Sequence, residues 1–363
     1  MVCSEKRKLK GSKVAIRSKT FRESYYEDIK LYQTIWIKCW MVLFLIGLVV
    51  LPFVGDPYIV YLINISCVAI IASLGLNILT GFTGQISLGH AAFFAIGAYC
   101  TAILSSQLEM PFWVCLPASG ALAAFIGLLI GIPCLRLRGL YLAMATMSFG
   151  VVVEYVVITW EEVTKGVRGI GVSTVNLFGY PLDSTNKLYY FLIAITALAI
   201  IAATNLVRTR VGRAFVAIRD RDIAAEIIGV NMTYYKVLAF TISSLYAGVA
   251  GGLYGYVMGY IHPEHFTFLL SIQYLAMIIV GGLGSILGSI FGAVFITIVP
   301  EFIKALADLL TLLIPALADK YDDGWNIAAF GLLIMFFLIF EPKGLFGIWG
   351  RIKTCFNNWP YTY

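Results

Sequence analysis

Long apolar runs follow one another along the chain from position 35 onward, separated by short polar or glycine-containing segments. A helix needs about 20 mostly apolar residues to cross the hydrocarbon core of a bilayer, and a helix satisfies its own backbone polar groups inside lipid. The runs therefore predict an all-α integral membrane protein, a polytopic helical bundle. The expected single spans are Ile35–Val54, Tyr58–Thr80, Ser87–Leu104, Trp113–Cys134, Tyr141–Trp160, Tyr189–Val207, Tyr235–Met258 and Asn326–Phe340.

One further apolar run, Phe268–Ile303, is too long for one ordinary helix. The glycine-rich segment Gly281–Ser285 interrupts it, and glycine weakens a helix interior. We divide the run there into two short or broken spans, which makes about ten in all, some of them broken by glycine. The following segment Glu301–Gly324 is expected outside, and its stretch Leu306–Leu317 predicts an amphipathic or partly re-entrant helix.

The charges of the loops indicate an orientation for these spans. Short cytoplasmic loops carry an excess of Lys and Arg. The loops near Asp56, Glu109 and His262 contain neither, whereas Arg208–Lys236 contains five Arg. With ten spans, both termini and the loop 208–236 lie on the cytoplasmic side.

Composition agrees with a chain that lipid solvates. Hydrophobic residues make up 60% of the 363 residues and charged residues 13%, about half the charged fraction of a soluble domain. The net charge of +6 comes from the first 38 residues, which hold ten Lys and Arg against four Asp and Glu. We therefore expect a basic cytoplasmic arm (1–34), a transmembrane permease domain (35–341) and a cytoplasmic tail (342–363). The arm is interpreted as an anchor, with binding of anionic lipid or nucleic acid as the alternative.

Sequence signatures of enzymes and metal sites are missing. The chain contains no GxxxxGK(S/T) phosphate loop, no HExxH and no GxSxG, and its seven Cys form no CxxC pair. The three His are scattered, and His262 and His265 flank a loop dipeptide. The pattern favours a transport subunit over an enzyme, and it predicts no metal site.

Three glycine-rich stretches stand out: Gly81–Ala98, Gly281–Gly292, and the row Ala247, Gly251, Gly255 and Gly259 at four-residue spacing. Small residues at this spacing let helices pack closely in lipid, and glycine clusters also permit unwound segments that line a transport path. Both interpretations stay open. Candidates for the path are Gly84, Gln85, Ser87, Gly89, His90, Gly281, Gly282 and Gly284.

Glu154 lies inside a predicted span, six residues before Trp160. A carboxylate at membrane depth is expensive and points to function, so Glu154 joins the path candidates. The alternative is that its side chain reaches the outer interface.

The loop Arg208–Asn231 combines helix-forming residues, alternating charge and a glycine, Gly229, where a helix would end. It predicts a pair of short amphipathic helices at the cytoplasmic surface. Such helices suit docking into a groove on a soluble partner. A solvated loop would explain the arginines, but not the spacing Ala224-Ala225-x-x-x-Gly229.

Several of these segments resemble permease subunits of bacterial ABC importers for branched-chain amino acids, the LivM type. The resemblance covers roughly residues 77–347. It rests on Gly81–Ala98, Leu137–Tyr141, Gly212–Asn231, Gly281–Gly292 and Phe340–Gly347.

The resemblance implies import of branched-chain amino acids across the bacterial inner membrane. It also implies a second homologous permease subunit, two ABC ATPase subunits that bind the ATP, and a periplasmic substrate-binding protein, with no cofactor in this chain. An ABC permease for urea or short amides is the alternative within the class. A stand-alone secondary transporter or channel is the alternative outside it.

The resemblance also assigns roles to residues. The element Ala224-Ala225-x-x-x-Gly229 looks like the motif by which such permeases pack against their ATPase, although Ile223 stands where a Glu is usual. The implied coupling residues are Arg213, Arg219, Asp222, Ala224, Ala225, Glu226 and Gly229. At the outer mouth such permeases often read Thr-Gly-Gly followed by another Gly, where this chain reads Thr164-Lys165-Gly166-Val167-Arg168-Gly169. Lys165 and Arg168 are two cations that would favour a substrate carboxylate or an acidic patch on the binding protein.

Overall fold

A computed structural model describes most of the chain between positions 47 and 358. The described residues are 47–53, 56–134, 137, 139–173, 175–177, 180–181, 185–313, 331–332, 335, 339, 341 and 344–358. The predicted arm lies outside them, as do most of the first predicted span, most of Asn326–Phe340, and parts of the tail. The chain divides into the units Met1–Val54 and Gly55–Tyr363. In the first unit, residues 47–53 are helical, and all the other described residues belong to the second unit.

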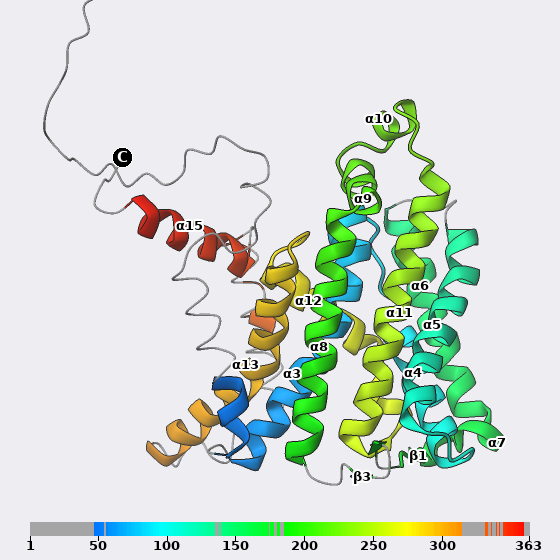
Figure 1. The fold of residues 1–363 in the computed structure, drawn as a ribbon, viewed down its shortest axis with the longest axis vertical. Helices are drawn as coiled ribbons and strands as arrows, with labels where there is room; N and C mark the ends of the chain where they lie inside the picture. Colours follow the sequence, from blue (N-terminus) through cyan, green and yellow to red (C-terminus); the bar gives the residue numbers. More distant parts are fainter. Residues whose placement is uncertain are drawn as a thin grey trace, which may run out of the picture. The chain divides into compact units, whose positions relative to one another are not determined.

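The second unit is a bundle of long helices that run side by side (Figure 1). The long helices are α3 (Pro57–Leu76), α4 (His90–Ser106), α5 (Phe112–Cys134), α6 (Leu140–Thr159), α8 (Thr185–Arg208), α11 (Met232–Met258), α12 (Phe268–Gly281) and α13 (Ile286–Leu313). A π-helical turn, η1 (Asn77–Phe82), extends α3.

Among the described residues, six of these helices are long and apolar enough to cross a membrane, and α4 and α12 are shorter apolar helices. These helices correspond to eight of the predicted spans, and the all-α, multi-pass prediction holds. The predicted bounds of α5, α6 and α11 agree with the structure to within three residues at each end. The total of ten is not confirmed.

Short elements connect the long helices at both ends of the bundle. They are α7 (Glu161–Thr164), η2 (Gly166–Arg168), β1 (Ile170–Gly171), β2 (Asn176–Leu177), β3 (Tyr180–Pro181), α9 (Arg210–Asp220), α10 (Asp222–Ile227), β4 (Tyr260–Ile261) and η3 (Pro263–Phe266). Helix α15 (Gly344–Asn358) is the last described element and contacts α12 and α13. β1 pairs antiparallel with β4, with Ile170 opposite Ile261. β2 and β3 form a second two-stranded ribbon.

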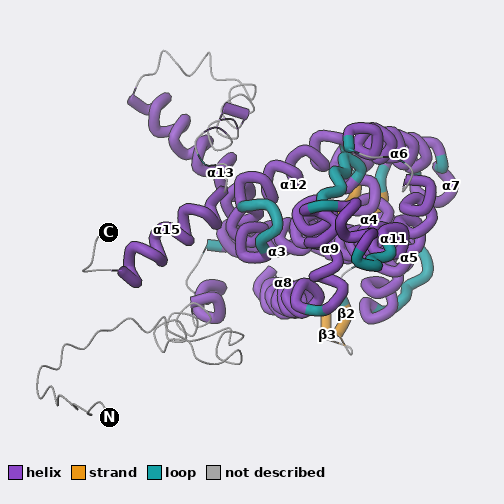
Figure 2. Tube along the Cα trace, turned by 90° about the horizontal axis from the view of Figure 1, so that it is seen from above, coloured by secondary structure: helices purple, strands orange, loops and turns teal. Residues whose placement is uncertain are grey.

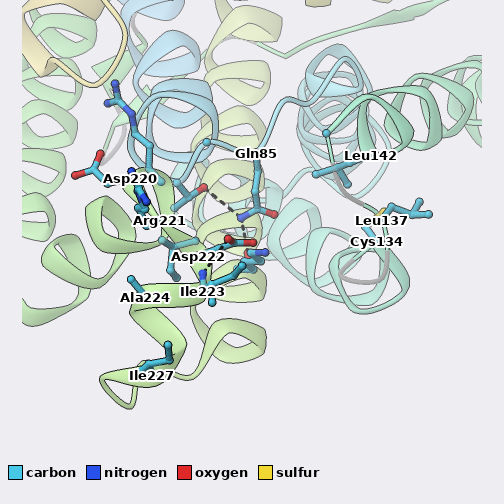
Figure 3. A pocket seen from close by; sticks show the side chains of 16 residues that line it. Gln85, Cys134, Leu137, Leu142, Asp220, Arg221, Asp222, Ile223, Ala224 and Ile227 are labelled. Atoms are coloured by element: carbon cyan, nitrogen blue, oxygen red, sulfur yellow. Dashed lines mark hydrogen bonds between the residues drawn. The ribbon is translucent and has the colours of Figure 1, made fainter.

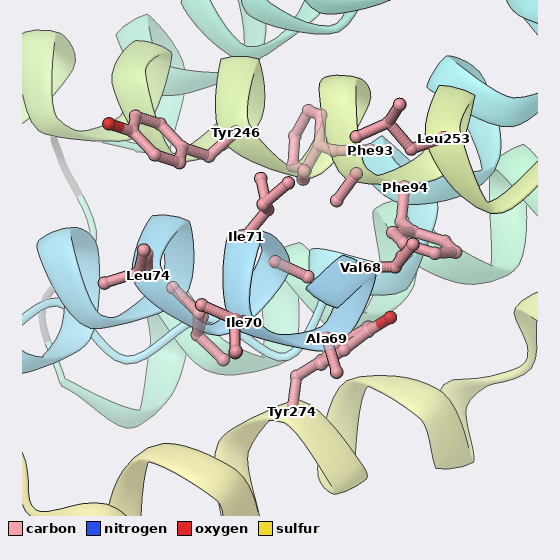
Figure 4. Packing of buried hydrophobic residues seen from close by; sticks show 14 of the residues in the cluster. Val68, Ala69, Ile70, Ile71, Leu74, Phe93, Phe94, Tyr246, Leu253 and Tyr274 are labelled. Atoms are coloured by element: carbon pink, nitrogen blue, oxygen red, sulfur yellow. The ribbon is translucent and has the colours of Figure 1, made fainter. Parts of the chain in front are cut away.

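Helix α11 lies at the centre of the bundle, where it packs against α3, α4 and α5. Seen from above, α3 lies between α8 and α12 (Figure 2). Large apolar side chains fill the space between these helices: Ile71 and Leu74 of α3 are fully buried, with Tyr246 of α11 above them and Tyr274 of α12 below (Figure 4). Close packing of these side chains fixes the helices against one another.

Glycines decide how closely α11 approaches its neighbours. A Cβ on Gly251 would lie 1.9 Å from the carbonyl oxygen of Phe94, and a Cβ on Gly97 would lie 2.1 Å from that of Gly248. In the predicted row on α11, Gly251 therefore serves close backbone packing, whereas a Cβ on Gly255 would meet no atom closer than 3.5 Å. Its last member, Gly259, differs, because it has a φ of 68° and ends the helix as its C-cap.

The division of Phe268–Ile303 is confirmed, because α12 ends at Gly281 and α13 begins at Ile286. The two helices then touch through backbone: a Cβ on Gly292 would lie 1.9 Å from the Met277 carbonyl oxygen. The structure differs from the prediction further on. Helix α13 continues through Pro300 to Leu313 rather than ending at Ile303, because residues 301–313 are mostly the helix-forming Ala, Leu, Glu and Lys. Residues 314–330 lie outside the described part.

Candidate functional site: the α9–α10 projection and the cavity beside it

The loop between α8 and α11 folds into two short helices, as the sequence predicts. Helix α9 turns back at Thr209, where Gly212 permits contact with the end of α8; a Cβ there would lie 2.1 Å from the Val207 carbonyl oxygen. Phe215 and Ile218 are buried on its inner face, and the Phe215 ring meets Tyr235 of α11 edge-on. Helix α9 is therefore anchored to the bundle by apolar contacts.

Helix α10 ends at a glycine in the way the sequence indicates. Gly229 has a φ of 90°, its N–H donates to the Glu226 carbonyl (3.0 Å), and the Val230 N–H donates to the Ala225 carbonyl (3.0 Å). This pair of bonds is a Schellman motif, which glycine closes without steric strain. The Ala225 side chain is 2% exposed and faces inward.

Three isoleucines on and just after α10 face outward. Ile223 is 68% exposed, Ile227 81% and Ile228 75%. The α10 tip projects beyond the ends of the long helices (Figure 1). Exposed apolar groups set among charged residues mark an interaction surface. The spacing of alanines and glycine singled out this loop in the sequence, and three isoleucines in a strongly polar loop are a further signal that the prediction did not use.

A cavity of about 590 Å³ lies beside α9 and α10 (Figure 3). Its lining brings together residues from two groups that the sequence put forward separately. Gly84 and Gln85 come from the path candidates, and Arg219, Asp222 and Ala224 from the coupling candidates. The cavity therefore connects the glycine-rich segment after α3 to the projecting helices.

The segment Gly84–Gly89 is unwound, as its glycines permit. Gly84 has a φ of 71°. Gln85 holds the segment in place, because its Nε2 donates to Thr83 Oγ1 (3.2 Å) and to the Lys236 carbonyl of α11 (3.4 Å). Its backbone oxygen accepts from Thr80 Oγ1 (3.1 Å).

The rest of this stretch is packed inside the bundle. Ser87 and His90 are each 2% exposed, and a Cβ on Gly89 would lie 2.3 Å from the Thr146 carbonyl oxygen of α6. His90 Nε2 lies 2.9 Å from the Ala72 carbonyl of α3. Because a carbonyl only accepts, Nε2 carries the proton there, and the ring joins α4 to α3.

The glycines of the second cluster, Gly281–Gly292, also differ in role: some pack against neighbouring backbone and others form the turn. Gly281 packs against Gly288, where a Cβ would lie 2.0 Å from the carbonyl oxygen. Gly282 (φ 122°) forms the turn after α12 and lies against Gly344 of α15. Gly284 (φ 75°) instead contacts Arg219 and donates its N–H to Asn77 Oδ1 (2.9 Å).

The remaining coupling candidates lie around the same helices. Arg213 is exposed and donates from Nη1 to the Arg208 carbonyl (3.4 Å). Glu226 is exposed on α10, and Asp222 Oδ1 accepts from the Ile223 N–H (2.8 Å) at the start of that helix. Arg219 points the other way, and its Nη1 donates to the Gly81 carbonyl at 2.7 Å.

Glu154 is half-buried near the opposite end of the bundle, beside Gly150, Pro263 and Phe266. It forms no ion pair with any residue that the structure describes. It is therefore not part of the cavity beside α9 and α10.

The opposite end is covered by the segment after α6. The Gln107 side chain donates to the Val163 carbonyl and Ser173 Oγ to the Ser105 carbonyl, both at 3.0 Å. Lys165 and Arg168 are exposed there. Lys165 adopts a φ of 59°, a conformation that costs a non-glycine residue free energy.

His262 and His265 lie at this end, His262 just before η3 and His265 within it. Burial, with a smaller contribution from His262, lowers the pKa of His265 below its ordinary value, so this ring is neutral at neutral pH. Within the described ranges, no group of three or more His, Cys, Asp or Glu side chains could hold a metal ion.

The family described as "Branched-chain amino acid transport system / permease component" matches residues 58–340. The chain belongs to this family. It is 33% identical to the Escherichia coli high-affinity branched-chain amino acid transport system permease protein LivM, over 84% of this chain and 74% of that protein. The Pseudomonas aeruginosa high-affinity branched-chain amino acid transport system permease protein BraD is 26% identical, over 78% of this chain and 92% of its own length. An autoinducer 2 import permease, LsrC of an Enterobacter strain, is 29% identical over 41% of each chain.

No solved structure matches the chain. The family match covers every long helix from α3 to α13 and includes α9 and α10. The chain is therefore a multi-pass membrane permease of a branched-chain amino acid transport family, and that family is one of transport proteins rather than enzymes.

Proposed function

We propose that this chain is the membrane-spanning subunit of an ATP-driven importer that carries branched-chain amino acids across the bacterial inner membrane. Its partners are a second homologous permease, two ABC ATPase subunits that bind the ATP, and a periplasmic substrate-binding protein. Relatives named as high-affinity branched-chain amino acid permeases support the substrate class.

The observation that carries the ATP-driven part of this proposal is the exposed isoleucine surface on α10. Ile223, Ile227 and Ile228 are 68%, 81% and 75% exposed, and each would stabilise an interface by roughly 1.5–3 kcal/mol if fully buried. A short helix of this kind suits a groove on a soluble protein. The tip of α10 is therefore proposed as the surface that docks on the ATPase.

The orientation follows from this docking. The α9–α10 end faces the cytoplasm, and the end that carries α7, β1 and η3 faces the periplasm (Figure 1). Ten spans in residues 35–341, with the arm and tail both cytoplasmic, agree with the five arginines of the loop between α8 and α11. The cavity beside Gln85 then lies on the cytoplasmic side of the path, and Glu154 lies on the periplasmic side.

The docking surface is tested by co-purification of the ATPase with the detergent-solubilised permease. Ile227→Asp places a charge on the apolar tip, and Gly229→Glu puts a side chain on a backbone with a φ of 90°. Each is expected to reduce the co-purified ATPase about tenfold or more, which corresponds to about 1.4 kcal/mol or more.

Val167→Asp is the matched control, because Val167 is a similar aliphatic residue, 61% exposed, at the opposite end. It should bring down as much ATPase as the unchanged protein. If no ATPase accompanies even the unchanged protein, the chain is not an ABC subunit, and leucine, isoleucine and valine uptake would have to be driven in another way.

The two outer cations are proposed to attract an acidic patch on the binding protein or a substrate carboxylate. The double variant Lys165→Gln with Arg168→Gln should lower uptake at subsaturating binding protein up to about fivefold, because exposed ion pairs contribute about 0–1 kcal/mol. It should also flatten the decrease of uptake with added salt, since salt screens charges over about 10 Å at 0.1 M. Uptake and docking that match the unchanged protein at every salt concentration would remove both residues from the site.

A further inference from the structure

Three segments that are far apart in the sequence meet at one point below α9. They are the π-helical turn η1 at the end of α3, the turn between α12 and α13, and the C-terminal part of α9. Arg219 of α9 donates from Nη1 to the Gly81 carbonyl of η1 (2.7 Å). Asn77 of η1 accepts from the Gly284 N–H and donates to the Ser285 carbonyl, both at 2.9 Å.

The geometry leaves no room for a side chain at position 81 or position 284. A Cβ on Gly81 would lie 1.7 Å from Asn77 Oδ1 and 2.6 Å from the Gly284 nitrogen. A Cβ on Gly284 would lie 2.3 Å from Arg219 Nη1, and its φ of 75° already favours glycine. One glycine from each of the stretches Gly81–Ala98 and Gly281–Gly292 is therefore explained by this single contact.

The end of η1 explains why the Gly81 carbonyl is available to Arg219. In a continued α-helix, this carbonyl would accept from the backbone N–H of Gln85, four residues later. Here the Gln85 N–H donates to Leu79 instead, at 3.2 Å, because the helix widens and then unwinds. A carbonyl at a helix C-terminus has a partial negative charge, and a guanidinium is a favourable partner for it.

Arg219 stands between this junction and the proposed docking surface. Only Arg221 separates α9 from α10, and the residue before Arg219, Ile218, is buried in the bundle. A displacement of the α10 tip therefore shifts the end of α9 that carries Arg219.

We propose that Arg219 is a positioning residue: it makes α9, the end of α3 and the α12–α13 turn move together when the ATPase displaces α10. The inference rests on the proposed function, and it separates Arg219 from residues that touch the ATPase. Without the Arg219 bond, the docked subunits would still hydrolyse ATP. The end of α3 and the α12–α13 turn, however, would no longer move with α9.

The test uses the complete transporter, with its ATPase subunits and binding protein, in proteoliposomes. Arg219→Met is expected to keep the co-purified ATPase and ATP hydrolysis within about twofold of the unchanged complex, while uptake per ATP falls about tenfold (about 1.4 kcal/mol). Arg219→Lys should restore much of the uptake, because a single N–H···O bond also suits an ammonium group. Arg210→Met, an exposed arginine on the same helix, is the matched control and should behave as unchanged.

The outcomes are distinguishable from a failure of the proposed function. If the unchanged chain binds no ATPase, the proposed function fails and this inference falls with it. If Arg219→Met loses the ATPase, Arg219 belongs to the docking surface, and if uptake per ATP is unchanged, the bond to Gly81 transmits nothing; either result overturns the inference. Arg219→Gln, which keeps a polar group in the cavity but is too short to reach Gly81, replaces the Met variant if that protein melts early.

Discussion

Replacement of Gly251 by alanine is expected to weaken the bundle more than its single added methyl group suggests. The new Cβ would lie 1.9 Å from the Phe94 carbonyl oxygen, 2.8 Å from its carbon and 3.0 Å from the Ala98 nitrogen. All three atoms are backbone of α4, so no side chain can rotate away and the two helices must separate. Overpacking of this kind costs about 1–3 kcal/mol or more, and the melting temperature of the purified protein in detergent should fall.

Gly150→Ala is the matched control for Gly251→Ala. Gly150 also lies within a long apolar helix, α6, but a Cβ there would meet no atom within 4 Å. Alanine in a helix interior is favoured over glycine by roughly 0.5–1 kcal/mol, so this variant should melt at the same temperature or higher. Equal losses in both variants would show that the α4–α11 contact is not the reason why glycine is needed at position 251.

Replacement of Asn77 by leucine should destabilise the protein strongly, whereas the same replacement of Asn64 should not. Both residues lie on the helix that α3 and η1 form together, and both are at most 1% exposed. The Asn77 amide satisfies the Gly284 N–H and the Ser285 carbonyl, and each buried group left unpaired costs about 1–3 kcal/mol. The amide of Asn64 has no partner for either atom in the described structure, so leucine there removes a desolvation cost.

Thermal unfolding of the two leucine variants, side by side, measures this difference. Asn77→Leu should melt earlier than the unchanged protein, and Asn64→Leu should melt at the same temperature or later. A large loss in Asn64→Leu would mean that this amide has a polar partner in the assembled transporter. An unchanged melting temperature in Asn77→Leu would mean that the α12–α13 turn is held by its glycine backbone alone.

Much of the fold could be predicted because the bilayer imposes its own length scale. The apolar runs match α5, α6 and α11 within three residues, and the glycines at Gly281–Ser285 mark the break between α12 and α13. Gly229 is predicted to end a short helix, and it closes a Schellman motif. Each of these features depends on residues that are close in sequence.

The start of α4 depends on contacts that the hydrophobic pattern does not contain. The apolar run predicts a helix from Ser87, but α4 begins at His90, because Gly84 takes a φ of 71° and Gln85 bonds to α11 instead of to its own helix. The π-helical end of α3 is not predicted either. It depends on contacts with Arg219 and with the turn before α13, which lie more than 130 residues away.

The candidate site could be predicted in part. The spacing of alanines, glycine and charges identifies the loop after α8, and this loop does form two short helices. The spacing does not tell which side chains face outward. Ala225 turns inward and Ile227 outward, because the apolar contacts of α9 with α8 and α11 set the rotation of the pair.

By itself, the sequence determined that the chain is a multi-pass helical membrane protein, where most of its helices lie, and which loop could meet a partner. Composition and hydrophobic period suffice for these properties, since lipid acts on every residue of a span alike. Only the tertiary structure decided which glycines pack helices together and which bend the backbone. The tertiary structure alone places the Arg219 side chain against Gly81 and Gly284. This position depends on three segments, distant in sequence, that meet within the length of one side chain.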